Sequence, residues 1–296
     1  MTPTACIRTE LRHLVRELGL LNRNCLNSGM TFSQAYILNY ISKNGPTPFV
    51  ELQMQLGIDK ASLSRTVNIL RERKYLHIVS NSADKRSKNI AILPAGNLAL
   101  SRAEESANST VDNLLSDCNE NGWIKVYEAL RRLRLSALRN NLAANPKRLR
   151  IEPLRDAYFD AAVELIVQIF SGEQNIPSHL VPISKRKSPQ WWCARVGEDI
   201  IGAAAAWKAS GQWHWGRFAI DKNFRGLGIG KSLAIESITA LFTGVTDQIT
   251  IEARDATVGI IKKLGGKQTN PPFDFFGAPV TPMELEKKAF LQNFEE

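Results

Sequence analysis

The sequence of 296 residues contains no run of about 18 consecutive apolar residues, and its N-terminus lacks the apolar core of a signal peptide. We therefore expect neither a membrane-spanning helix nor a secretory leader. Cysteine is also scarce: Cys6, Cys25, Cys118 and Cys193 are widely scattered and lack the spacing of metal ligands. This usage predicts reduced, mostly structural thiols in a cytoplasmic protein, with no metal site.

Acidic residues are fewer than basic ones, and the difference is uneven along the chain. Residues 1–145 carry 19 Lys and Arg against 12 Asp and Glu, whereas residues 146–296 carry 19 against 17. Nearly all of the net charge of +9 therefore lies in the first half. A nucleic-acid-binding module needs such an excess for phosphate contacts, although modest positive charge is common in other proteins too. The length suits two domains.

Helical periodicity dominates the first half of the chain. In the first segment, leucine and valine form one stripe with arginines around it. Thr31 or Ser33 caps the next helix, and the break at 45–48 follows it. Two short helices then meet at a tight glycine-containing turn, which is typical of a helix-turn-helix. The expected helices cover residues 4–27, 31–43, 49–56 and 60–74.

The helix expected over 60–74 is amphipathic, with an apolar face formed by Leu63, Val67 and Leu70. Ser62, Arg65, Asn68 and Arg71 are spaced to project from related faces on the other side. Small hydroxyls allow close approach to the floor of a DNA groove, and Arg65 can reach a guanine edge or a phosphate. The alternative is an ordinary solvated helix face.

A hairpin pattern follows this helix, with strands over 78–80 and 89–92. The tip between them, residues 82–88, places three cations on an exposed loop. This arrangement has the form of a wing.

These separated motifs, in this order, resemble the MarR family of winged-helix repressors. The resemblance implies a winged helix-turn-helix domain over residues 1–145 that binds double-stranded DNA, at a pseudo-palindromic operator, as a homodimer. Helices over 97–117 and 123–141 are then the partners of the first helix at the dimer interface. The resemblance rests on Thr31, Leu52, the run 58–65, Leu70, the wing motif Asp84-Lys85-Arg86, Leu93 and Gly96.

The same resemblance implies the DNA contacts. Arg86 of the wing is expected to enter a minor groove, and Asp84 is expected to brace a nearby arginine. The threonine expected before Gly96 is displaced by Pro94-Ala95, which affects only the start of the next helix. The implied DNA-binding residues are Lys60, Ser62, Ser64, Arg65, Asn68, Asp84 and Arg86.

Residues 141–150 are interpreted as a linker, with Pro146 ending the last helix of the first domain. The second domain is expected over 149–296, where strands and helices alternate. This alternation predicts an α/β fold around a mixed central sheet. The expected strands cover 149–151, 191–196, 200–208, 212–220 and 248–253, and the expected helices 155–170, 231–241 and 256–264.

A glycine-rich turn over 225–230 lies between a strand pattern that ends at Ile220 and a helix pattern that begins at Lys231. Such a turn leaves backbone N–H groups with no side chains in the way, and the helix adds the positive end of its dipole. The pair predicts a seat for a pyrophosphate, although glycine also marks ordinary tight turns. A nicotinamide-type fingerprint is disfavoured, because a βαβ unit with an acidic residue about 20 positions further on is not evident.

This arrangement resembles motif A of the GNAT superfamily of N-acetyltransferases, whose pattern Gln/Arg-x-x-Gly-x-Gly/Ala is matched by Arg225, Gly228 and Gly230. The resemblance covers roughly residues 151–285 and implies an acetyl-CoA site. Backbone amides of 225–231 then bind the pyrophosphate, and the strand edge at 218–220 pairs with the pantetheine arm. The implied cofactor-binding residues are Phe218, Ala219, Ile220, Arg225, Gly226, Leu227, Gly228, Ile229, Gly230 and Lys231.

Acetyl transfer to an amine needs a base or an ordered water near the attacking nitrogen. Strand alternation predicts His214, Gly216, Phe218 and Ile220 on one face. Counted back from the motif, His214 falls where protein-acetylating members of the superfamily place a glutamate base, and histidine titrates near the right pH. His214 is the predicted catalytic residue; the alternative is a strand histidine held by a structural hydrogen bond.

The acid that protonates the leaving thiolate is harder to identify. Many relatives carry a tyrosine on the last helix for this task, and here that position is Ile261, with Arg254 in place of the usual upstream asparagine. Either water or another group supplies the proton, or the domain is a slow enzyme or a ligand sensor.

Five of the six tryptophans lie in the second half of the chain. Part of this set is expected in the core, because tryptophan packs well on sheets. We also predict an aromatic-lined acceptor site for a small apolar or aromatic amine, completed by residues 172–183. The acceptor-site candidates are Trp191, Trp192, Trp207, Trp213 and Trp215.

Two functional classes follow from these observations. The first is a bifunctional transcriptional regulator whose enzyme domain acetylates a small amine. The second is a regulator whose GNAT-like domain only senses acetyl-CoA or a metabolite, which requires different affinities for the two DNA-binding states. A third hypothesis is acetylation of protein lysines.

Overall fold

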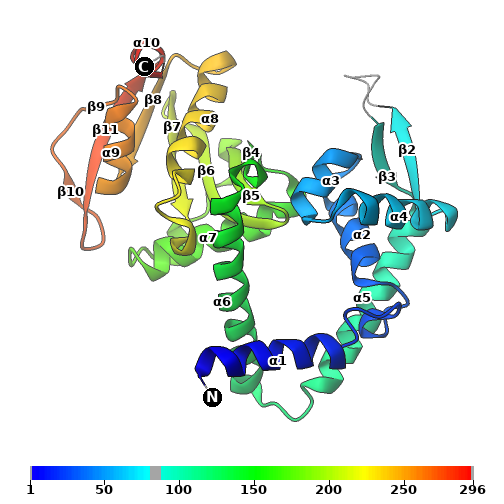
Figure 1. Cartoon of the computed structure of the whole chain (residues 1–296). Helices are drawn as coiled ribbons and strands as arrows, with labels where there is room; N and C mark the ends of the chain where they lie inside the picture. The colour runs from blue at the N-terminus through cyan, green and yellow to red at the C-terminus, as the bar shows by residue number, and fades with distance from the viewer. Residues whose placement is uncertain (1, 81–87, 295–296) are drawn as a thin grey trace. The chain divides into compact units, whose positions relative to one another are not determined.

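The structure is a computed structural model that describes residues 2–80 and 88–294 (Figure 1). Its contacts divide the chain into two compact units, Met1–Arg134 and Leu135–Glu296, and each is described by itself. Among the described residues, no helix combines the length and the apolar character needed to cross a membrane.

The N-terminal unit consists of helices and a small antiparallel sheet with the strand order β1-β3-β2. The expected helix-turn-helix and hairpin are both present, so the predicted fold class is confirmed here. The elements are α1 (Pro3–Glu17), α2 (Phe32–Asn44), β1 (Thr47–Pro48), α3 (Phe49–Leu56), α4 (Lys60–Glu72), β2 (Leu76–Ser80), β3 (Lys88–Ile92), α5 (Pro94–Leu114) and the first part of α6 (Glu120–Ala144).

Local sequence explains most of these boundaries. Thr31 and Gln34 form a capping box that begins α2, and Gly57, with a φ of 64°, ends α3. The first helix is shorter than expected, because it ends at Glu17 instead of near residue 27. Gly19, with a φ of 60°, follows soon after its end, in backbone that cannot continue the helix.

One core holds the N-terminal unit together. Leu63, Val67 and Leu70 of α4 are buried against α2, α3 and the hairpin, which confirms the expected apolar face. The backbone of Tyr75 approaches the start of α5 so closely that only a glycine fits at position 96. A Cβ at this position would lie 2.4 Å from the carbonyl oxygen of Tyr75, so a side chain does not fit.

The division between the units lies inside α6 and differs from the expected linker at 141–150. Leu135, Leu138 and Leu142 of α6 are buried in the core of the C-terminal unit. Their helical spacing places them on one face of the last turns, and this burial assigns those turns to the C-terminal unit. The helix ends at Ala144, and a 3-10 turn, Pro146–Arg148, follows it.

The C-terminal unit is built on a mixed sheet with the order β10-β11-β8-β7-β6-β5-β4, to which β9 adds beside β11. The pair β7 and β8 is parallel, and the other described pairs are antiparallel. The strands are β4 (Arg150–Pro153), β5 (Gln190–Val196), β6 (Asp199–Ala209), β7 (Gln212–Ile220), β8 (Gln248–Ala253), β9 (Lys267–Gln268), β10 (Phe273–Asp274) and β11 (Pro279–Glu286). The helices are α7 (Phe159–Gly172), α8 (Ile229–Gly244), α9 (Asp255–Lys263) and α10 (Lys287–Phe294).

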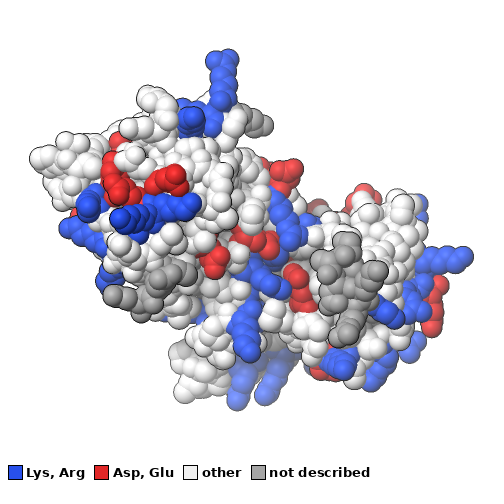
Figure 2. All heavy atoms as spheres, turned by 90° about the horizontal axis from the view of Figure 1, so that it is seen from above, with Lys and Arg blue, Asp and Glu red and all other residues white. Residues whose placement is uncertain are grey.

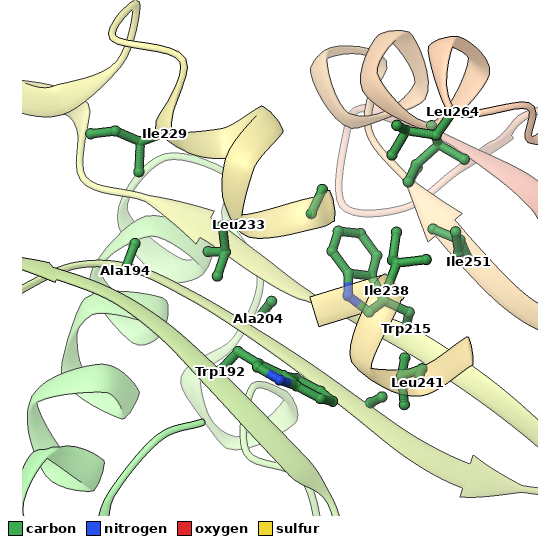
Figure 3. Packing of buried hydrophobic residues seen from close by; sticks show 14 of the residues in the cluster. Trp192, Ala194, Ala204, Trp215, Ile229, Leu233, Ile238, Leu241, Ile251 and Leu264 are labelled. Carbon is green, nitrogen blue, oxygen red and sulfur yellow. The ribbon is translucent and has the colours of Figure 1, made fainter. Parts of the chain in front are cut away.

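The two faces of this sheet carry different cores. On one face, Leu233, Ile238 and Leu241 of α8 pack with Trp192 and Trp215 (Figure 3). On the other face, apolar residues of α7 pack against a cluster that includes Ala203 of β6 and Ala219 of β7. The mixed α/β architecture expected for the second half is therefore confirmed, and β7 lies inside the sheet with helices over both faces.

Candidate functional site

An irregularity in β7 shapes the site. Gly216 pairs with Ala205 and Ala219 pairs with Ala203, so two residues of β7, Arg217 and Phe218, lie opposite one residue of β6. Arg217 has a φ of 49°, which is unusual for a residue with a side chain. This is a β-bulge, and it shifts the alternation of side chains by one residue.

The bulge corrects the expectation that His214, Gly216, Phe218 and Ile220 share one face. Phe218 and Ile220 pack with the core on the α8 side. Ala219 packs with the core on the α7 side. Gly216 lies on the same face as Ala219, because their partners on β6, Ala205 and Ala203, are two residues apart. His214 and Gly216 therefore lie on the opposite face from Phe218 and Ile220, because the extra residue reverses the strand between them.

A second irregularity opens the sheet next to the bulge. The parallel pairing of β7 with β8 comprises His214 with Thr250 and Trp215 with Ile251. Beyond Trp215, in the described chain, this edge of β7 has no strand partner. A cavity of about 640 Å³ lies there, bounded by both strands, the end of α7 and the start of α8. Unpaired backbone groups on the edge of β7 can bind an extended ligand in the manner of an added strand.

The glycine-rich turn forms one end of this cavity. Gly226 and Gly228 have φ values of 83° and 77°, a conformation in which glycine alone is unstrained. Among the described residues, the backbone N–H groups of 226–231 donate to no protein acceptor. The first turn of α8 leaves such groups free in any case, and its dipole favours negative charge. The geometry therefore suits a phosphate group.

Hydrogen bonds fix the chain just before this turn. The buried carboxylate of Asp221 accepts bonds of 2.8 Å from the backbone N–H and from the side chain of Asn223. Arg139 of α6 donates from Nη1 to the carbonyl oxygens of Asn223, at 2.5 Å, and Arg225, at 3.0 Å. Arg225 forms an ion pair of 2.8 Å with Glu173. The sequence analysis missed Arg139, because the residue lies 84 positions before its first partner.

Most of the expected cofactor-binding residues line this cavity. Leu227 is the exception, since it packs against the core on the α8 side. The lining residues among them are Phe218, Ala219, Ile220, Arg225, Gly226, Gly228, Ile229, Gly230 and Lys231. Their role in binding a cofactor stays a prediction.

His214 lies at the other end of the cavity, on the face covered by α7. Its ring stacks on the indole of Trp207 of β6, with ring centroids 5.8 Å apart and an interplanar angle of 11°. Both side chains are half-buried and line the cavity. The catalytic role of His214 stays a prediction, but the position is reachable for a small molecule inside the cavity.

The five tryptophans proposed for the acceptor site have different surroundings. Trp207 lines the cavity. Trp215 also belongs to the wall, but it is 1% exposed, and its Nε1 donates to Ser237 at 3.0 Å. Trp192 is buried on the α8 side, and Trp191 packs edge to face against Phe159. The structure does not bring Trp191, Trp192 or Trp213 to the cavity.

Position 261, where many GNAT proteins carry the tyrosine that protonates the leaving thiolate, provides no acid in this chain. Ile261 is fully buried in the core. Arg254 donates hydrogen bonds to the carbonyl oxygens of Ala278 and Phe275, the latter at 2.7 Å, and thus fixes the loop between β10 and β11. One acidic residue that does line the cavity is Glu252 of β8, which lies on the same face of the sheet as His214.

A separate candidate surface lies on α4 in the N-terminal unit. Lys60, Ser62, Ser64, Arg65 and Asn68 are all exposed, on the side away from the buried leucines. Asp59 caps the helix, and its carboxylate accepts from the backbone N–H of Ser62 at 2.9 Å. Hydrogen bonds from the side chain and backbone of Ser62 hold the pKa of Asp59 below its usual value. Asp84 and Arg86 of the wing lie outside the described residues.

Basic side chains are also more abundant than acidic ones on the face that Figure 2 shows.

The N-terminal unit has, in addition, an exposed apolar surface on its terminal helices. Its exposed members are Ile7, Leu11 and Leu14 of α1, Val111 and Leu114 of α5, and Trp123, Val126, Tyr127, Leu130 and Leu133 of α6. This set is a candidate interaction surface.

The fold has two parts, a unit with a helix-turn-helix and an α/β unit that contains a cavity. Residues 28–87 match the model of the MarR family, and residues 179–287 match the model of the acetyltransferase (GNAT) domain. The chain therefore contains one segment that matches the MarR family model and a second segment that matches the GNAT acetyltransferase domain model.

The following solved structures each match less than half of this chain. Escherichia coli ElaA is 15% identical, with a TM-score of 0.42, and the match covers 47% of this chain and 99% of that chain. A putative N-acetyltransferase from Lactobacillus plantarum is 20% identical, with a TM-score of 0.42 and coverage of 47% and 97%. A probable transcriptional regulator from Pseudomonas aeruginosa is 23% identical, with a TM-score of 0.39 and coverage of 43% and 96%. No curated protein matches the chain.

Proposed function

We propose that the chain is a DNA-binding regulator whose C-terminal domain transfers an acetyl group from acetyl-CoA to a small amine. The observation that carries the proposal is the cavity between β7 and β8, with free backbone N–H groups of residues 226–231 at one end and His214 at the other. One end suits a pyrophosphate and the other suits amine chemistry.

The chain's own residues have distinct tasks in this proposal. The turn and the start of α8 bind the diphosphate, with positive charge from Arg225 and Lys231, and the free edge of β7 binds the pantetheine arm. An imidazole nitrogen of His214 accepts the proton of the attacking amine. The acetyl-CoA thioester supplies the acyl group, so a C–N bond forms as the C–S bond breaks. Water protonates the leaving thiolate, because Ile261 provides no acid.

The same buried Ile261 favours a second candidate function, in which the domain binds acetyl-CoA as a signal and transfers nothing. Purified protein, acetyl-CoA and a panel of amines distinguish the two functions through release of free thiol. Amine-dependent thiol release supports the enzyme. Binding of acetyl-CoA without release contradicts the enzyme and supports the sensor. Mass spectrometry of the incubated chain detects the remaining possibility, lysine acetylation.

For the N-terminal unit, we infer that α4 binds the major groove of double-stranded DNA and that two chains associate. The exposed polar face of α4 supports the first statement. The exposed apolar side chains of α1, α5 and α6 support the second, with another copy of this chain as the occupant. A twofold dimer reads two half-sites and so requires a pseudo-palindromic operator.

A further inference from the structure

The α7 side of the cavity has a flat aromatic floor. Trp207 lies over Gly216, and a Cβ on this glycine would be 3.2 Å from the Cη2 atom of the indole. The missing side chain therefore lets the indole lie close to the backbone of β7. His214 stacks on the same indole, so the floor and the predicted base are adjacent.

Arg217 brings a positive charge to this floor. The bulge turns its side chain toward the indole, and Cζ lies 5.4 Å from the ring centroid of Trp207 and 6.0 Å from that of Phe170. Nε donates to the carbonyl oxygen of Val181 at 2.7 Å, and Nη2 donates to that of Leu180 at 3.1 Å. Three of the five N–H groups of a guanidinium remain after these two bonds.

This guanidinium has no carboxylate within ion-pair distance among the described residues. Burial lowers the pKa of Arg217, and the negative charge of Glu252 partly opposes this effect. An arginine nevertheless stays charged in proteins. A half-buried cation with no carboxylate in direct contact, in a cavity of ligand size, becomes more favourable when a ligand brings an anion.

We propose that the acceptor is a small amine that carries a carboxylate, as an amino acid does, and that Arg217 binds this carboxylate. The remaining N–H groups on Nη1 and Nη2 form one edge of the guanidinium, which can hold a carboxylate with two hydrogen bonds. The apolar part of the acceptor lies on Trp207, and its amine faces His214. This inference rests on the proposed acetyl transfer and specifies its substrate class.

Matched pairs of amines that differ only in the carboxylate test the inference. L-phenylalanine is compared with 2-phenylethylamine, and L-tryptophan with tryptamine, through kcat/KM for thiol release with acetyl-CoA. We expect a preference of about 10- to 100-fold for the amino acid in at least one pair, because a charge-assisted hydrogen bond has this magnitude. Calorimetry with the CoA-bound protein measures the same preference without turnover.

The variant Arg217→Gln keeps an amide donor for the carbonyl oxygens but removes the charge. It should reduce the preference to less than about 3-fold, while the affinity for CoA changes little. Arg217→Lys should retain part of the preference. Lys208→Gln, at an exposed position on β6, is the matched control and should behave as the unmodified protein does.

Two results would overturn the inference. In the first, no pair shows a preference for the carboxylate, in rate or in binding, or Arg217→Gln keeps the preference. In the second, Arg217 is required only for transfer from an acyl-CoA with a carboxylate in its acyl group, such as succinyl-CoA, and amines are not distinguished. Carboxylate-selective binding without turnover, in contrast, supports Arg217 as the carboxylate site and contradicts only acetyl transfer.

Discussion

Arg139 donates a hydrogen bond of 2.5 Å from Nη1 to the carbonyl oxygen of Asn223, which joins the last part of α6 to the segment before the glycine-rich turn. A second bond from the same atom reaches Arg225. Arg139 lies outside both segments that match family models, 28–87 and 179–287. The proposed phosphate seat is therefore braced by a residue that belongs to neither match.

Replacement of Arg139 tests this brace. We expect Arg139→Ala to weaken acetyl-CoA binding about 10-fold, because the turn loses two hydrogen bonds from a charged donor. Isothermal titration calorimetry measures the change, and circular dichroism checks that the helix content is kept. Asn140→Ala, at the exposed next position on α6, is the control. Equal CoA affinity of both variants would show that the brace has no part in binding.

Replacement of Arg65 tests the DNA-binding surface. Arg65→Ala should weaken operator binding by about 10-fold or more, since a good bidentate contact to a base contributes roughly 1–3 kcal/mol. Fluorescence anisotropy at several salt concentrations measures the affinity. A loss shared equally by operator and unrelated DNA, with a shallower salt dependence, would indicate a phosphate contact instead. Arg102→Ala, exposed on α5, is the control, and an unchanged affinity in both variants would exclude Arg65 from the interface.

The apolar surface of the terminal helices is tested by a charge on α6. Leu130, which is 52% exposed on α6, can accept a glutamate without loss of core packing in the free chain. We expect Leu130→Glu to convert the dimer into monomers in light scattering after size-exclusion chromatography, because a charge opposes burial at an interface. Operator affinity should fall in parallel, and acetyl-CoA affinity should not. A monomeric unmodified protein would contradict the proposed dimer.

The four thiols should separate into two reactivity classes. Burial raises the pKa of Cys193 to about 12, with Glu152 adding to the effect, and burial also raises the pKa of Cys25. Because the thiolate is the reactive form, both should resist a maleimide at pH 8. Cys6 and Cys118 are exposed and should react, and mass spectrometry counts the adducts. Fast labelling of Cys193 in the folded protein would contradict the described sheet.

Local signals in the sequence predicted much of the fold. The bounds of α3, β7 and β8 agree with the expected ranges, and for two of them glycine marks an end: Gly57 follows α3 and Gly211 precedes β7. The strand β11 and helix α10 were not predicted. The strand depends on pairing with β8 and β9, and sequence patterns do not record such distant contacts.

The site was predictable only where its residues are consecutive. The glycine-rich turn combines its signal in six neighbouring positions, so sequence alone indicated a phosphate seat. Arg139 reaches the turn through tertiary packing, and Arg217 reaches the cavity through a bulge that alternation does not foresee. Both arginines are ordinary charged residues in the sequence, and their roles follow from the folded chain.

The most direct test of the central proposal is titration of acetyl-CoA into the full chain and into Gly228→Val. Gly228 has a φ of 77°, and a Cβ there meets no protein atom within 4 Å, so the variant chiefly strains and obstructs the phosphate seat. Gly244→Ala, at the end of α8 and also without close neighbours, is the control. We predict one molecule of acetyl-CoA per chain for the unmodified protein and the control, and loss of binding in Gly228→Val. Absence of binding to the unmodified chain, or equal affinity in Gly228→Val, would contradict the assignment.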